Sequence, residues 1–333
     1  MEDGFVPFDS KEFNFTSYLS NARERFTGRL WLYNELETNL MKQDTDRGVL
    51  VIGEPGAGKS ALTAQLICSR SSNPFIHKRI IGYHLCKHAD KATQDPGRFV
   101  RNLVDLMARR VPEYGMLVSN SSFIFSVLER SCLRDPFECF EQAVIAPLLQ
   151  LKGEPQIYFI VIDALDECSS ESGGTSVVQF IRETSSKLPK WIRLVMTSRN
   201  DSNVLKHFSH FPKVYLSSTD ARNLQDIEVF ITAKLFEDAP ILERLKVMLG
   251  FSIGEEISFL TSRLLSQSQG NFLYVKEMFH FWKDDRNNEV DFGHIPKTIG
   301  GIYERYLKRI YGSREKFKPA LAILEIMVAA FEP

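Results

Sequence analysis

Neither sign of charge is in excess in this sequence, and no long apolar run occurs in it. Its 333 residues include 41 lysines and arginines against 42 aspartates and glutamates, which gives a net charge of −1. This balance gives no electrostatic reason to expect nucleic acid or an anionic membrane as a partner. No apolar stretch approaches the roughly 20 residues that span a bilayer, and the acidic start Met1-Glu-Asp-Gly4 lacks the apolar core of a secretory signal. We therefore expect a cytoplasmic protein with no transmembrane segment and no nucleic-acid partner.

Cysteines are few, and internal repeats and low-complexity linkers are missing. The five cysteines are an odd number without a Cys-x-x-Cys pair, so we expect reduced thiols. His84, Cys86 and His88 lie close together in the sequence. A metal site would need a second cluster of ligands, and none accompanies them, so we expect them to be structural.

Apolar runs alternate with helical patterns in the first two thirds of the chain. Strand-like runs cover residues 49–52, 80–86, 157–162, 192–196 and 213–216. Helical patterns include residues 30–41, with leucines at four-residue spacing, and residues 96–110, which open with a proline. Continuous apolar strands that alternate with helices indicate a parallel sheet covered on both faces. We predict a three-layer α/β domain over residues 24–218, preceded by an N-terminal arm over residues 1–23.

Beyond residue 218 the sequence shows helical patterns and no convincing strand. We predict a helical domain over residues 219–294 and a further segment over residues 295–333. The last helical pattern ends at Phe331 with an apolar face that nothing remaining can cover. We therefore expect the chain to be a fragment of a longer protein.

The most informative motif is Gly53-Glu-Pro-Gly-Ala-Gly-Lys59-Ser60, which follows the apolar run 49–52 directly. It has the pattern of a phosphate-binding loop, with a strand before it and a helix after it. Glycines allow backbone N–H groups to surround an anion at a helix N-terminus. Lys59 is expected to reach the β- and γ-phosphates, and the Ser60 hydroxyl to ligate Mg²⁺. The predicted nucleotide contacts in this loop are Gly53, Glu54, Pro55, Gly56, Ala57, Gly58, Lys59, Ser60 and Ala61.

A second motif, Asp163-Ala-Leu-Asp166-Glu167, ends the apolar run 157–162. An aspartate at the end of a buried strand can hold Mg²⁺ rigidly, usually through a water molecule. We predict this role for Asp163. Asp166 and Glu167 follow at the edge of the sheet where α/β proteins bind ligands, so either can act on the attacking water. An exposed acidic turn is the alternative interpretation.

Thr197 and Arg199 follow the strand-like run 192–196. Polar residues at the end of a central strand can face the γ-phosphate. Arg199 is then expected to pair with a phosphate oxygen, and Thr197 with the catalytic water. A strand-end cap with a solvated arginine is an equally weighted alternative.

A glycine turn at Arg25-Phe26-Thr27-Gly28-Arg29 precedes the first helical pattern. It could bring Phe26, Gly28 and Arg29 against an adenine ring. A simple N-terminal cap loop fits the same residues equally well.

These four motifs, in this order, resemble the NACHT-type, signal-transducing (STAND) branch of P-loop NTPases. Two later strings, Gln269-Gly-Asn-Phe-Leu-Tyr274 and Ile295-Pro296 followed by Ile302-Tyr303 and Tyr306, resemble the family's small helical domain and the approach to its winged helix. Within this branch, the sequences of these motifs are most similar to the NTPase cores of large animal ankyrin-repeat scaffolds such as the TANC proteins.

The resemblance implies a sheet of order 5-1-4-3-2, then a helical domain that leads into a truncated winged-helix region. It implies that Arg199 senses the γ-phosphate and that Pro296 touches adenine. It also implies protein partners bound by repeats outside this sequence, and homo-oligomerisation as an open possibility.

The predicted function is a signalling switch that binds ATP or ADP with Mg²⁺ and hydrolyses ATP slowly. Adenine is favoured because no guanine-reading Asn-Lys-x-Asp motif occurs. One alternative is a scaffold module that holds the nucleotide as a structural cofactor without turnover. Another is an AAA+ motor acting on nucleic acid, which the balanced charge disfavours.

Overall fold

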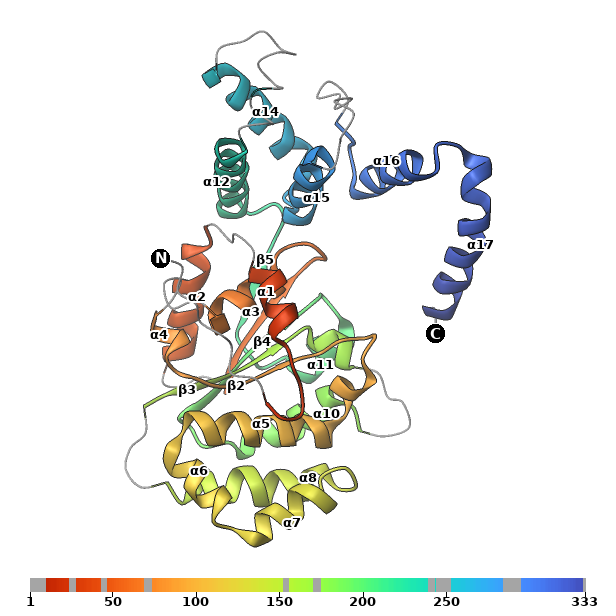
Figure 1. Ribbon diagram of the computed structural model, residues 1–333. Helices are drawn as coiled ribbons and strands as arrows, with labels where there is room; N and C mark the ends of the chain where they lie inside the picture. Colours follow the sequence, from red (N-terminus) through yellow and green to blue (C-terminus); the bar gives the residue numbers. More distant parts are fainter. Residues whose placement is uncertain are drawn as a thin grey trace. The chain divides into compact units, whose positions relative to one another are not determined.

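The computed structural model describes residues 10–23, 28–42, 47–68, 74–151, 156–169, 175–238, 243, 253–283 and 295–331. The chain divides into two compact units, Met1–Ser217 and Ser218–Pro333 (Figure 1).

A parallel five-stranded sheet forms the centre of the first unit, in the order β2-β3-β4-β1-β5 (Figure 1). The strands are β1 (Gly48–Gly53), β2 (Ile80–Leu85), β3 (Tyr158–Asp163), β4 (Ile192–Ser198) and β5 (Lys213–Leu216). All four strand pairings are parallel. The predicted order 5-1-4-3-2 is the same order read from the other edge, so this prediction is confirmed.

Helices cover both faces of this sheet. Successive residues of a strand point to opposite sides of the sheet, so the apolar strands give it two apolar faces to cover. In β1, Val49 and Val51 belong to one apolar core, and Leu50 and Ile52 to the other. The first core includes residues of α1 (Thr16–Arg23), α2 (Leu30–Met41), α3 (Lys59–Cys68) and α4 (Pro74–His77). The second includes residues of α5 (Pro96–Arg110), α6 (Pro112–Ser119), α7 (Ser122–Arg130), α8 (Pro136–Phe140), α9 (Ala146–Leu149), α10 (Val177–Thr184) and α11 (Ser202–His207). The predicted three-layer α/β architecture is therefore confirmed.

Short helical turns complete this unit. They are η1 (Lys91–Gln94), η2 (Glu141–Ile145, a π-helical turn), η3 (Leu165–Cys168) and η4 (Ser185–Lys187).

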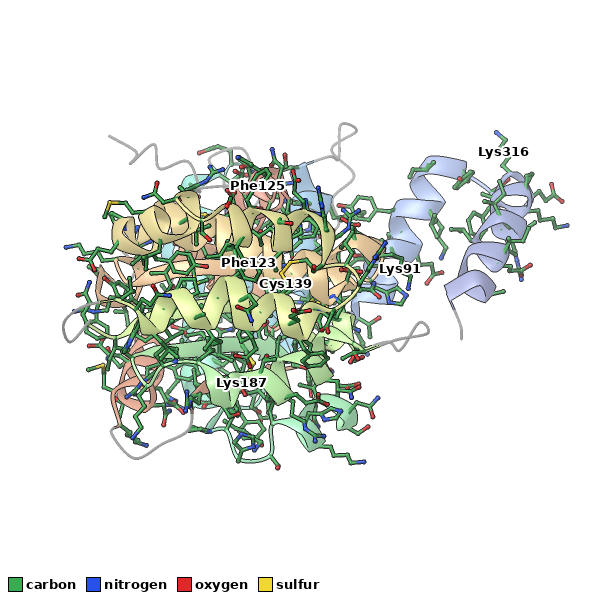
Figure 2. The ribbon with its side chains drawn as sticks, turned by 90° about the horizontal axis from the view of Figure 1, so that it is seen from below. Lys91, Phe123, Phe125, Cys139, Lys187 and Lys316 are labelled. Carbon is green, nitrogen blue, oxygen red and sulfur yellow. A yellow bond between two sulfur atoms is a disulfide. The ribbon has the colours of Figure 1, made fainter. Side chains whose placement is uncertain are left out.

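On the same side as α5, α7 presents Phe123 and Phe125 to solvent, 58% and 61% exposed (Figure 2).

Four of the five cysteines form disulfides in the structure. Cys86 is joined to Cys168, and Cys132 to Cys139, while Cys68 is free and buried. The expectation of reduced thiols is therefore wrong for four residues. The pairing of Cys86 with Cys168 spans 82 residues and results from strand order, because β2 and β3 are neighbours whose ends meet at one sheet edge. Sequence spacing carries no sign of that neighbourhood.

The second unit is helical throughout the part of residues 218–333 that the structure describes. Its helices are α12 (Ala221–Glu237), α14 (Ile253–Ser268), α15 (Phe272–Lys283), α16 (Ile299–Tyr311) and α17 (Arg314–Phe331). A separate apolar core, which includes Ile231, Leu264 and Trp282, holds α12, α14 and α15 together. Across the described residues, none of the helices is both long and apolar enough to cross a membrane.

Candidate functional site

The loop that joins β1 to α3 has the backbone conformation of a nest for an anion. Gly56 and Gly58 have φ angles of 80° and 92°, which residues with a side chain rarely adopt. A Cβ on Gly58 would meet no atom closer than the Arg29 Nη2 at 3.8 Å, so backbone conformation rather than space requires glycine there. The loop ends where α3 begins at Lys59. The orphan N–H groups of a helix N-terminus attract negative charge at this position.

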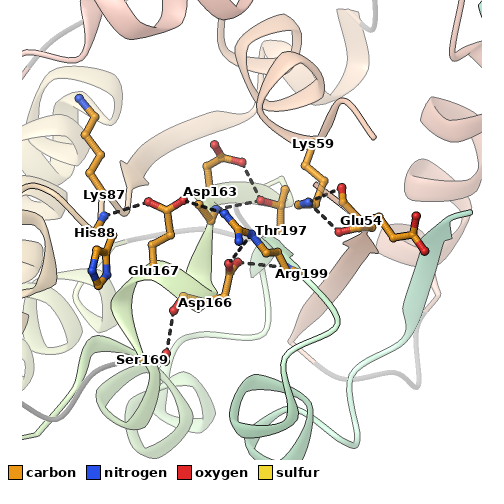
Figure 3. Close-up of polar contacts among 12 residues, drawn as sticks. Glu54, Lys59, Lys87, His88, Asp163, Asp166, Glu167, Ser169, Thr197 and Arg199 are labelled. Atoms are coloured by element: carbon orange, nitrogen blue, oxygen red, sulfur yellow. Dashed lines mark hydrogen bonds and ion pairs between the residues drawn. The ribbon is translucent and has the colours of Figure 1, made fainter. Parts of the chain in front are cut away.

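The Lys59 ammonium group lies against the carbonyls of its own loop. Its Nζ donates to the Gly53 carbonyl at 2.7 Å and to the Glu54 carbonyl at 3.1 Å (Figure 3). Burial lowers the pKa of Lys59, while the carboxylates of Asp166 and Asp163 act in the opposite direction. The ammonium group is thus positioned at the loop and satisfied by weak neutral acceptors that an anion can replace.

Arg29 holds the same loop from the other side. The turn before α2 has positive φ angles at Gly28 (89°) and Arg29 (66°). Arg29 is only 1% exposed, and its Nη2 donates to the Ala57 carbonyl at 2.8 Å. The structure therefore brings Arg29 to the loop at Ala57. Phe26 lies outside the described residues.

Asp163 ends β3 beside α3, with its side chain buried. Its Oδ1 accepts hydrogen bonds from the hydroxyls of Thr63 at 2.9 Å and Thr197 at 2.6 Å. Thr63 lies on α3 three residues after Ser60, so the carboxylate faces the start of the loop helix. A serine hydroxyl and a carboxylate are the hard oxygen ligands that suit Mg²⁺.

Tyr18 of α1 also reaches Asp163. Its hydroxyl donates to the Asp163 Oδ2 at 3.4 Å. Burial and the charge of Asp163 raise the pKa of Tyr18 to about 12, although the nearby Ser60 side chain acts against the rise. The phenol is therefore a neutral donor to Asp163, one of the predicted magnesium ligands.

Thr197 connects the central strands at this edge of the sheet. It lies on β4 opposite Val51 of β1. Its hydroxyl donates to Asp163 and accepts from the Ala164 N–H at 2.9 Å. Ala164 has a φ of 55°, so this bond holds the turn that follows Asp163. The Thr197 hydroxyl thus fixes the carboxylate, and its predicted contact with a catalytic water stays a prediction.

Arg199 forms an ion-pair network with both carboxylates of the acidic turn (Figure 3). Its backbone N–H donates to the Asp166 Oδ1 at 3.0 Å, and its Nε lies 3.3 Å from the Asp166 Oδ2. Its Nη2 lies 3.8 Å from the Glu167 Oε1. The other Glu167 oxygen accepts from the backbone N–H of His88 at 2.9 Å.

Three contacts of this site carried little or no signal in the sequence. Thr63 lies one helical turn after Ser60, a spacing that could have indicated a residue facing the same edge. The N–H of His88 and the hydroxyl of Tyr18 had no such signal, because Tyr18 lies 145 residues from Asp163 in the sequence.

Pro296 lies in the second unit, where its carbonyl accepts a hydrogen bond from the Tyr274 hydroxyl. Its contact with adenine stays a prediction.

A family model described as "Nephrocystin 3, N-terminal" matches residues 27–199, just over half of the chain. Among solved structures, the fold is similar to that of the Walker-type ATPase PABY2304 of Pyrococcus abyssi. That likeness has a TM-score of 0.50 and 13% identity, and covers 93% of this chain and 77% of the other. At such low identity it shows the fold alone, which is that of P-loop NTPases.

Two more distant structures are C. elegans PCH-2 and the Aeropyrum pernix ORC1 protein in complex with DNA. The first has a TM-score of 0.39 at 12% identity, covering 87% of this chain and 72% of the other. The second has a TM-score of 0.35 at 15% identity, covering 92% of this chain and 85% of the other. Neither likeness is close enough to carry an argument.

Proposed function

Since the chain belongs to the Nephrocystin 3, N-terminal family and has the fold of P-loop NTPases, we propose that it binds ATP or ADP with Mg²⁺ and hydrolyses ATP slowly. The observation that carries the proposal is the contact between Asp163 and Thr63. It brings the helix that follows the phosphate loop and the end of β3, 100 residues apart in the sequence, to one edge of the sheet, with Lys59 close to the same carboxylate.

The loop residues are suited to hold a triphosphate. Backbone N–H groups around Gly56 and Gly58 bind phosphate oxygens, and Lys59 exchanges its two loop carbonyls for a charged phosphate, which is the stronger acceptor. Ser60 and Asp163 hold Mg²⁺, which supplies charge neutralisation on the phosphates when bound. Gly53, Glu54, Pro55 and Ala57 complete the loop around the nucleotide, and Ala61 lies in the first turn of α3.

Arg199 is suited to couple the γ-phosphate to the acidic turn. In the structure it forms ion pairs with both Asp166 and Glu167. A γ-phosphate competes for the same guanidinium group. Movement of Arg199 to the phosphate leaves Glu167, or Asp166, able to orient a water and accept its proton. Its return after phosphate loss restores the ion pairs, so the pairing state of Arg199 reports which nucleotide is bound.

One observation favours the alternative of a nucleotide-binding scaffold module without turnover. Both carboxylate oxygens of Glu167 already have partners, Arg199 and the His88 N–H. A carboxylate held in this way is a poor base unless the nucleotide releases it. In this alternative, ATP or ADP stabilises the fold by mass action.

Phosphate release discriminates between the two. We expect slow release by the wild type, a fall of at least about a hundredfold in Glu167→Gln, and no release in Lys59→Ala. Release by the wild type no faster than by Lys59→Ala, with ATP still stabilising the wild type against heat, would support the scaffold module instead.

More specifically, we propose that the chain is a member of the NACHT-type STAND branch of P-loop NTPases, similar to the ankyrin-repeat scaffold proteins. The motifs of the sequence support it, from Gly28-Arg29 to Thr197-Ser198-Arg199. In this reading the nucleotide state controls interdomain packing or oligomerisation of a larger scaffold protein in the cytoplasm, whose partners bind elsewhere. Light scattering with ATP and with ADP tests it, because a mass that is the same in both states contradicts control of oligomerisation.

A further inference from the structure

We propose that Tyr18, in the N-terminal arm, gates the magnesium position between Ser60 and Asp163. This inference rests on the proposed function. The Tyr18 hydroxyl donates to the Asp163 Oδ2 at 3.4 Å, and the Ser60 side chain is a further polar neighbour of the phenol. Asp163 and Ser60 are the side chains expected to hold the ion, so the phenol lies beside a group that the ion must contact.

The two oxygens of Asp163 have different roles in this geometry. Oδ1 already accepts from the hydroxyls of Thr63 and Thr197. Oδ2 is therefore the oxygen that remains for a water bound to Mg²⁺, and Tyr18 donates to it. A carboxylate oxygen can accept more than one hydrogen bond, but a water on the ion and the phenol oxygen approach the same Oδ2. We therefore expect the hydroxyl to move aside when the ion binds.

The arm that carries Tyr18 is anchored on the first unit by residues before α1. Ser10 donates to the Asn102 Oδ1 at 2.6 Å, and the N–H of Lys11 donates to the Asp105 Oδ2 at 2.8 Å. Phe13 and Phe15 are buried in the core.

The Tyr18 ring also has a cationic neighbour, because the Lys87 Nζ lies 5.0 Å from its centroid. These contacts return the phenol to Asp163 when the ion is absent. The arm therefore keeps the Tyr18 hydroxyl next to Asp163, where it competes with Mg²⁺.

The test uses Tyr18→Phe, which removes the hydroxyl and keeps the ring. The thermal stabilisation by a fixed ATP concentration is titrated with Mg²⁺. We expect the midpoint of this titration to fall about threefold to tenfold in Tyr18→Phe, which is the range of one net hydrogen bond. Stabilisation by ATP in EDTA should be the same in both proteins.

Tyr114→Phe is the matched control. The Tyr114 hydroxyl donates to the Ala143 carbonyl at 2.6 Å in the core of the same unit. Its loss should lower stability and leave the Mg²⁺ midpoint unchanged.

A second measurement does not depend on a variant. Amide hydrogen exchange over Thr16–Arg23 in the wild type should become faster with ATP and Mg²⁺, and stay unchanged with ATP in EDTA. A Tyr18→Phe midpoint equal to that of the wild type, or unchanged exchange in α1 on adding Mg²⁺ to the ATP-bound protein, overturns the gate. If ATP fails to stabilise the wild type at every Mg²⁺ concentration, the proposed function fails as well.

Discussion

Replacing Thr197 with valine tests how Asp163 is held at the edge of the sheet. Valine has nearly the same shape as threonine but cannot form hydrogen bonds. The change removes the donor at 2.6 Å from the Asp163 Oδ1 and the acceptor at 2.9 Å from the Ala164 N–H. Because Asp163 is 1% exposed and the lost donor faces Oδ1 rather than the open Oδ2, bulk water is a poor replacement for that donor.

The magnitude follows from these two bonds. A hydrogen bond to a charged group contributes about 1.5–3 kcal/mol, and a buried donor left without an acceptor costs about 1–3 kcal/mol. Thr63 still donates to the same oxygen, so we expect the lower part of the sum, a loss of about 3 kcal/mol in the free energy of unfolding. Thr63→Val removes one such bond and should cost about 1.5–2 kcal/mol.

The assay is urea unfolding followed by tryptophan fluorescence, with Thr184→Val as control. Thr184 is equally buried, but its hydroxyl donates only to the Phe180 carbonyl of its own helix. Its replacement should cost less than about 1 kcal/mol. A Thr197→Val loss no larger than that of Thr184→Val would refute the reasoning that this hydroxyl fixes Asp163.

Three further predictions follow from contacts around the site. Burial lowers the pKa of His84 to about 4, below the ordinary value of about 6.5, so the unfolded state takes up a proton first as pH falls. The free energy of unfolding should therefore decrease between about pH 6.5 and pH 4, by up to about 3 kcal/mol, and His84→Gln should flatten that slope in urea titrations. The Cys86–Cys168 disulfide closes a long loop, so changing both to serine should cost about 2–4 kcal/mol of stability; a wild type equally stable with and without dithiothreitol would contradict this. Arg29→Met removes the donor to the Ala57 carbonyl and should weaken ATP binding about tenfold in calorimetry, whereas unchanged affinity would show that the loop does not need this brace.

Local patterns predicted the elements whose signals lie within a few residues. The helices 30–41 and 96–110 are α2 and α5 with the same bounds. Leucines at four-residue spacing define the buried face of the first. In the second, the Asp95 side chain accepts from the Arg98 N–H at the start of the helix, and Pro96 fills a position where no N–H is needed. The strand order came instead from the resemblance to a known family, because no periodicity encodes it.

At the site, contacts between residues far apart in the sequence could not be predicted. Glycine and lysine spacing identified the phosphate loop, and a buried strand ending in aspartate identified Asp163. The packing of α1 against α3 brings Tyr18 to that aspartate, and neither segment carries a pattern that refers to the other. The pairing of Cys86 with Cys168 was missed for the same reason, since an odd count of thiols says nothing about which strand ends meet, whereas Cys132 and Cys139 are only 7 residues apart in the sequence.

The most direct test of the central claim is calorimetric titration of the protein with ATP, ADP and GTP, each with and without Mg²⁺. We predict a single site that prefers adenine nucleotides, tighter ATP binding when Mg²⁺ is present, and no measurable binding in Lys59→Ala. Equal affinity of Lys59→Ala and the wild type for ATP would contradict a nucleotide site at this loop.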